Sequence, residues 1–62
     1  MIDRNDTHGA PPACRVLVVD DDRVHRAYAR CVFEAFGCDV GLAVDGLEAI
    51  RLARETAFDI IL

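Results

Sequence analysis

Three adjacent carboxylates, Asp20, Asp21 and Asp22, are the residues in this sequence best suited to chemistry, and they directly follow an apolar run that ends at Val19. A hard cation such as Mg²⁺ is usually held by one or two carboxylates together with phosphate oxygens and waters. Three neighbouring negative charges also repel one another unless something offsets them. The triplet therefore indicates a cation or phosphate site.

Asp22 has a second explanation, because an aspartate at this position can cap the helix that follows by accepting a backbone N–H. This leaves Asp20 and Asp21 as the candidate metal ligands. The alternative is a solvated acidic turn with no ligand, since acidic residues are favoured at helix N-termini. Spacing alone leaves both interpretations open.

The surrounding residues predict the elements that would position the triplet. Residues 15–19 predict a strand buried on both faces, as in parallel sheets. Residues 22–36 predict a helix that ends before Gly37, a residue free to adopt a left-handed conformation. Its expected core-facing stripe, at three- and four-residue spacing, consists of Val24, Tyr28, Cys31, Val32, Ala35 and Phe36.

The second half of the chain continues the alternation. Residues 38–44 predict a strand, and residues 46–56 predict a helix that Asp45 and Glu48 begin as a capping box. Residues 58–62 predict a third buried strand. The order strand, helix, strand, helix, strand predicts an α/β fold with parallel strands, in which ligands bind at the carboxyl edge of the sheet.

Composition excludes several classes of protein. The 62 residues carry a net charge of −4, which argues against direct contact with nucleic acid, and they are too apolar for a disordered chain. With no stretch that could span a membrane and no secretory signal, the expected location is the cytoplasm. Residues 1–13 are polar and predict a flexible leader.

The three cysteines, Cys14, Cys31 and Cys38, fit neither a disulfide framework nor a zinc site and are expected to be reduced thiols.

Four segments, in order and with matching spacing, resemble the first half of a response-regulator receiver domain. They are RVLVVDDD at 15–22, the helix-ending Gly37, AVDGLEAI at 43–50 and FDIIL at 58–62. The resemblance covers residues 14–62 and implies a flavodoxin-like doubly wound parallel sheet, truncated to βαβαβ. It also implies that Asp20 and Asp21 hold Mg²⁺, the second usually directly and the first often through water.

The resemblance also implies a phosphorelay function, with a sensor histidine kinase or a phosphotransfer protein as partner. The family's phosphoacceptor aspartate lies at the carboxyl edge, about two residues beyond the position of Leu62. The resemblance also implies a switch Ser or Thr at the end of a fourth strand and a Lys at the end of a fifth, both beyond Leu62. Asp59 is misplaced to act as the phosphoacceptor and Thr56 to act as the switch residue, and the sequence contains no Ser and no Lys. We therefore expect the fragment to be no enzyme, to accept no phosphate and to bind Mg²⁺ weakly or not at all.

Other interpretations involve different classes of protein. The chain could be a non-catalytic interaction half-domain that pairs with itself or a partner through its exposed third strand. A different doubly wound enzyme would need a glycine-rich phosphate loop, but Gly37 is the first glycine after the leader. We interpret His25 as an ordinary helix residue, and Arg23, Arg26 and Arg30 as either a kinase-docking face or a solvated helix face.

Overall fold

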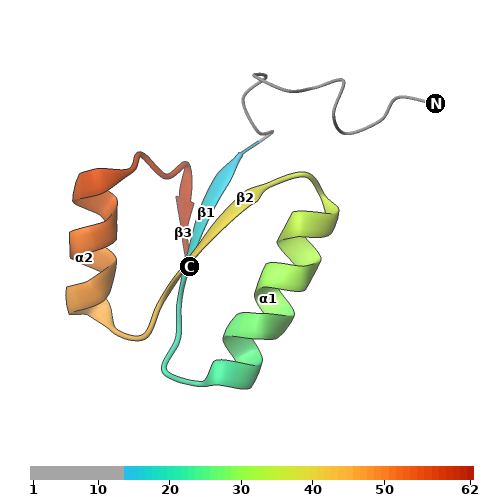
Figure 1. The fold of residues 1–62 in the computed structure, drawn as a ribbon, viewed down its shortest axis with the longest axis horizontal. Coiled ribbons are helices and arrows are strands. Elements are labelled where there is room, and N and C mark those ends of the chain that lie inside the picture. Colours follow the sequence, from blue (N-terminus) through green and yellow to red (C-terminus); the bar gives the residue numbers. More distant parts are fainter. Residues whose placement is uncertain (1–13) are drawn as a thin grey trace.

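The computed structural model describes residues 14–62, which form a three-stranded parallel sheet and two helices (Figure 1). The predicted leader, residues 1–13, lies outside the described residues. The elements, in chain order, are β1 (Arg15–Val19), α1 (Arg23–Ala35), β2 (Asp39–Ala43), α2 (Gly46–Glu55) and β3 (Ile60–Ile61). The predicted alternation of strands and helices is confirmed.

The central strand of the sheet is β1, and the strand order is β2-β1-β3. Val16 of β1 is in register with Val40 on one side and with Ile60 on the other, and both pairings are parallel. Because β2 and β3 lie on opposite sides of β1, the two crossovers run in opposite directions. Figure 1 accordingly shows α1 and α2 on opposite sides of the sheet. The arrangement confirms a flavodoxin-like, doubly wound fold with the order βαβαβ.

The core of the described residues is centred on β1. Val16, Leu17 and Val18 are buried, and Ala43 at the end of β2 is buried beside them. A strand on each edge and a helix over each face remove β1 from water, which is the environment that its unbroken apolar run predicts. The predicted bounds of this strand, residues 15–19, are confirmed.

Both ends of α1 form as predicted, but its buried face differs from the expected stripe. Gly37 follows the helix with a φ of 86°, in the left-handed region. Val24 and Tyr28 are 69% and 73% exposed. The half-buried apolar residues of α1 are Ala29, Val32 and Phe33, so only Val32 belongs to the predicted stripe. The prediction was wrong because α1 carries apolar residues on two faces, and sequence spacing cannot tell which one meets the sheet.

The second half of the fold shows smaller differences. The Glu48 N–H donates to Asp45 Oδ1 at 2.9 Å, as a capping box requires, but Glu48 Oε1 accepts from the N–H of Val44 instead of that of Asp45. The third strand is shorter than predicted, at two residues, and the prediction that it is buried was wrong, because Ile60 and Ile61 are both exposed. Before it, the ring of Phe58 lies over Gly41 of β2. This contact anchors the segment that leads into β3.

The structure contradicts the prediction of three reduced thiols. Cys14 and Cys38 form a disulfide across the amino ends of β1 and β2, whereas Cys31 is a free, exposed thiol on α1. The wide spacing of the cysteines concealed this pair, because only the parallel register of the two strands brings them together. Neither described helix has the length and apolar character needed to cross a bilayer.

Candidate functional site

The acidic triplet lies at the carboxyl edge of the sheet, between the ends of the two outer strands. The N–H of Asp20 donates to the carbonyl oxygen of Ala43, at the end of β2, at 3.0 Å. One residue earlier, the N–H of Val19 donates to the carbonyl oxygen of Leu62, just after β3, also at 3.0 Å. The backbone therefore fixes the triplet at the edge where open α/β sheets bind ligands.

Asp22 caps α1, as the sequence predicts. Its Oδ1 accepts the N–H of Val24 at 2.8 Å and the N–H of His25 at 3.2 Å. These two hydrogen bonds, that from His25 first, lower the pKa of Asp22 from its ordinary value of 3.8, and the charges of His25 and Arg26 act in the same direction. Asp22 is thus committed to the helix N-terminus as an ionised cap.

Asp20 is held by three neighbours. Its Oδ1 accepts the N–H of Asp22 at 2.9 Å, and its Oδ2 lies 3.3 Å from Nδ1 of His25. Nη1 of Arg26 donates to the Asp20 backbone carbonyl oxygen at 2.6 Å. Since the side chain of Asp20 is 34% exposed, its carboxylate is oriented but still open to solvent.

Asp21 differs from both neighbours. It is exposed, and within residues 14–62 its carboxylate takes part in no hydrogen bond or ion pair. Its oxygens are therefore available to an external ligand without breaking any contact among residues 14–62. One oriented and one unengaged carboxylate form a donor set that fits a hard cation, whose remaining positions phosphate oxygens and waters can fill.

Sequence reasoning missed two residues that meet the triplet. His25 lies between two carboxylates, with Nε2 3.9 Å from Oδ2 of Asp22 in addition to its contact with Asp20. Arg26 was assigned to a polar outer face with Arg23 and Arg30, but it is half-buried and turned toward β1. The available signal was position: both residues lie in the first turns of a helix whose cap, Asp22, comes two residues after Asp20.

The other acidic and hydroxyl candidates lie where the sequence places them. Oδ2 of Asp59 accepts the N–H of Arg15 at 2.8 Å, at the amino end of β1 and thus at the opposite edge from the triplet. Thr56 is the C-cap of α2. Among the described residues, no group of three or more His, Cys, Asp or Glu side chains converges as a metal site.

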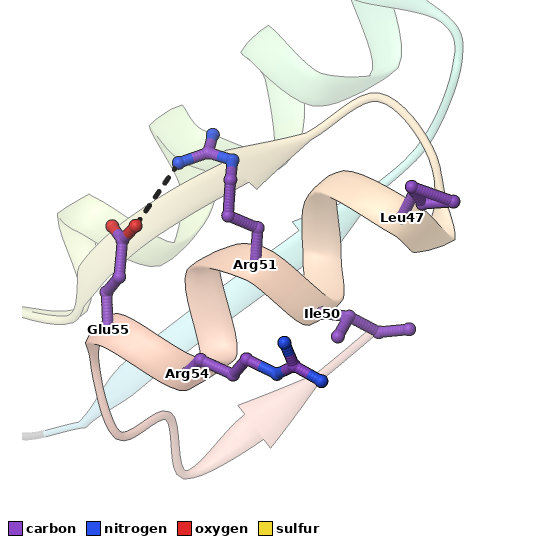
Figure 2. Close-up of a pocket in the computed structure, with 5 residues that line it drawn as sticks. All are labelled: Leu47, Ile50, Arg51, Arg54 and Glu55. Carbon is purple, nitrogen blue, oxygen red and sulfur yellow. Dashed lines mark hydrogen bonds and ion pairs between the residues drawn. The ribbon is translucent and has the colours of Figure 1, made fainter.

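A shallow pocket of about 420 Å³ lies along α2 (Figure 2). Leu47 and Ile50 line it and are 81% and 58% exposed, while Arg51 pairs with Glu55 at 3.5 Å. Arg54 projects from the same helix beside Ile50 in Figure 2. The pocket is formed by α2 alone, so it is separate from the acidic triplet.

The doubly wound parallel sheet, with an acidic pair at the carboxyl end of its central strand, is the arrangement that the resemblance to a receiver domain implies. The similarity of the chain to the transcriptional regulators described next is consistent with a fragment of a response-regulator receiver domain. The chain is 40% identical to Transcription factor prr1 of Schizosaccharomyces pombe over 48 residues. These residues are 77% of this chain and 9% of that protein. It is also 40% identical over 47 residues to Transcriptional regulatory protein ZraR of Klebsiella oxytoca, covering 76% of this chain and 11% of that protein.

A third relative, Transcription factor SKN7 of Candida albicans, is 37% identical over 51 residues, which are 82% of this chain and 9% of that protein. The chain thus spans about a tenth of the length of the curated relatives that it matches. No family model matches the chain, and no solved structure matches it.

Proposed function

We propose that this chain serves phosphorelay signal transduction by supplying the acidic, Mg²⁺-binding part of a receiver domain. The observation that carries the proposal is the position of Asp20 and Asp21 at the carboxyl end of β1, flanked by the ends of β2 and β3. A sensor histidine kinase or a phosphotransfer protein is the partner that this chemistry calls for, since it presents a phosphohistidine as phosphoryl donor.

In this proposal the two carboxylates have different tasks. Asp21, which is unengaged and exposed, ligates the ion directly, and Asp20, held by Asp22 and His25, ligates through water or at longer range. Arg26 keeps the backbone of Asp20 in place through the carbonyl oxygen. When bound, Mg²⁺ neutralises the charge of an incoming phosphoryl group, which is the main requirement of phosphoryl transfer.

The hydrogen bond from Val19 to Leu62 bears on where a phosphoacceptor would lie. It aligns the end of β3 with the end of β1, so residues directly following Leu62 would emerge beside the acidic pair. Within the 62 residues no aspartate follows β3, and Asp59 is engaged at the opposite edge. We therefore infer that these residues contribute the metal-binding half of the reaction and accept no phosphate themselves.

Intact-mass analysis after incubation with acetyl phosphate and Mg²⁺ tests the phosphate inference. The mass of the 62-residue chain should stay unchanged. An added phosphate that is lost at alkaline pH would be an acyl phosphate on one of the present carboxylates and would refute it. Titration calorimetry with Mg²⁺ tests the proposed metal site. We expect weak binding that disappears in Asp21→Asn but persists in Asp59→Asn.

A second candidate function is a non-catalytic interaction half-domain that pairs with itself or a partner. The observation in its favour is that β3 is an edge strand. Within the described residues it pairs only with β1, and Ile60 and Ile61 are 43% and 57% exposed. Exposed strand edges are ready templates for another strand. Sedimentation velocity separates the proposals, because a discrete dimer supports pairing and a monomer opposes self-association.

A further inference from the structure

The disulfide between Cys14 and Cys38 occupies a defined place in the fold. Cys14 directly precedes β1 and Cys38 directly precedes β2, and the next residues, Arg15 and Asp39, are register partners. The two Cα atoms are 4.8 Å apart, within the range that a disulfide spans. Beside the bridge, the N–H of Asp39 donates to the carbonyl oxygen of Cys14 at 2.8 Å. The parallel register thus brings the two sulfurs together.

The choice of partner is informative because a nearer cysteine exists. Cys31 is seven residues from Cys38, whereas Cys14 is 24 residues from it. In an unfolded chain the shorter loop closes more easily, by about six-fold from the three-halves power of loop length. The structure instead leaves Cys31 as an exposed thiol on α1. Pairing of Cys14 with Cys38 is therefore a property of the folded sheet.

We propose that Cys14 and Cys38 form a reversible, redox-sensitive staple that controls the stability of the β1–α1–β2 unit. Both residues are partly exposed, so a small thiol or disulfide can reach them. The staple closes the amino edge of the unit, and Asp20 and its contacts with His25 and Arg26 lie at the other end of β1. This inference rests on the disulfide and the register alone and is independent of the proposed phosphorelay function.

The redox step is a thiol–disulfide exchange with a low-molecular-weight disulfide such as oxidised glutathione. The thiolate of one cysteine attacks a glutathione sulfur, forms a mixed disulfide and releases one glutathione thiolate. The second cysteine then attacks the protein sulfur of the mixed disulfide and releases the other. Two protein thiols are oxidised to one disulfide, glutathione disulfide is reduced to two thiols, and the two thiol protons pass to glutathione.

Oxidation of the staple should raise the stability of the fold. A bridge over 24 residues restricts the unfolded chain more than the folded one, and only four apolar side chains of the described residues are buried. The urea midpoint of the oxidised chain should therefore lie clearly above that of the reduced chain. Cys31→Ser is the matched control, because it removes a thiol outside the staple and should keep the full difference.

The test equilibrates the wild-type chain with oxidised and reduced glutathione, alkylates the remaining thiols and maps disulfides by peptide mass. Under native conditions the bridge should join Cys14 to Cys38, with Cys31 alkylated or carrying glutathione. In concentrated urea the Cys31–Cys38 bridge should predominate over the native one by about six-fold. The same bridge distribution in both solvents, or three unbridged thiols in oxidised native samples, would overturn the proposal. Since this readout uses the wild-type chain, it does not depend on any variant folding.

Discussion

The ring of Phe58, two residues before β3 begins, packs against Gly41 of β2. A Cβ atom built on Gly41 would lie 2.9 Å from Cζ and 3.0 Å from Cε1 of the Phe58 ring, and 3.4 Å from Cδ1 of Leu17. Approaches near 3 Å force one group to move. We therefore predict that Gly41→Ala destabilises the fold by displacing the Phe58 ring.

Two opposing effects set the size of this change. Overpacking a filled site costs about 1–3 kcal/mol. The low end applies here, because the atoms in closest approach belong to the tip of the half-buried Phe58 side chain. Replacing glycine by alanine also restricts the unfolded chain, which offsets about 0.4–1 kcal/mol. Subtracting this offset from a cost of about 1 kcal/mol leaves an expected net loss of about 0–0.6 kcal/mol of unfolding free energy.

A double-mutant cycle measured by urea denaturation tests this reasoning. Phe58→Leu removes the clashing ring atoms, so the cost of Gly41→Ala should fall or vanish in the Phe58→Leu background. Gly46→Ala is the matched control, because nothing lies within 4 Å of a Cβ at that position and its φ is not in the left-handed region. Additive effects of the two changes, or equal stability of the Gly41→Ala and Gly46→Ala variants, would refute the account of this contact.

Three further predictions concern the ends of the elements. Gly37→Ala should cost about 1–2 kcal/mol in chemical denaturation, because Gly37 has a φ of 86°, a left-handed conformation. Asp59→Ala should cost about 0.5–1.5 kcal/mol in the same assay by removing the acceptor for the Arg15 N–H, whereas Asp39→Ala, which breaks only an exposed ion pair at 3.8 Å, should be nearly neutral. Because the folded state lowers the pKa of Asp22, the ionised cap stabilises the fold fully above pH 3.8 and progressively less as the pH falls through the native pKa. Asp22→Asn should therefore flatten the dependence of the melting temperature on pH below pH 3.8.

The sequence predicts those parts of the fold that local physics determines. The run at residues 15–19 is apolar at nearly every position and can only be a strand covered on both faces, as found. Asp22 and Gly37 mark the ends of α1 because an N-cap acceptor and a left-handed residue are needed at those points. These features depend on neighbouring residues alone.

Features that depend on how strands align and how helices pack on the sheet could not be predicted from neighbouring residues. The Cys14–Cys38 bridge requires β1 and β2 to be aligned, which no local pattern encodes. The buried face of α1 was misassigned because that helix is apolar on two sides, and the sheet covers only the side with Ala29 and Phe33.

The candidate site also has one part that the sequence predicts and another that only the folded structure determines. The sequence alone marks Asp20 and Asp21 as candidate ligands, but it does not distinguish their environments. The turn into α1 brings His25 and Arg26 back onto Asp20 and leaves Asp21 unengaged among the described contacts. The difference between an oriented and an available carboxylate is thus a product of folding.

We propose that the acidic pair at the carboxyl end of β1, Asp20 and Asp21, is a divalent-cation site. Mn²⁺ takes the oxygen ligands that Mg²⁺ takes and broadens nearby amide NMR signals even when it binds weakly. Small amounts of Mn²⁺ should selectively broaden the signals of residues 20–22, and excess Mg²⁺ should restore them. Asp21→Asn should abolish this broadening, whereas Asp59→Asn should not. Broadening centred on Asp59 at the opposite edge, or unchanged broadening of residues 20–22 in Asp21→Asn, would contradict it.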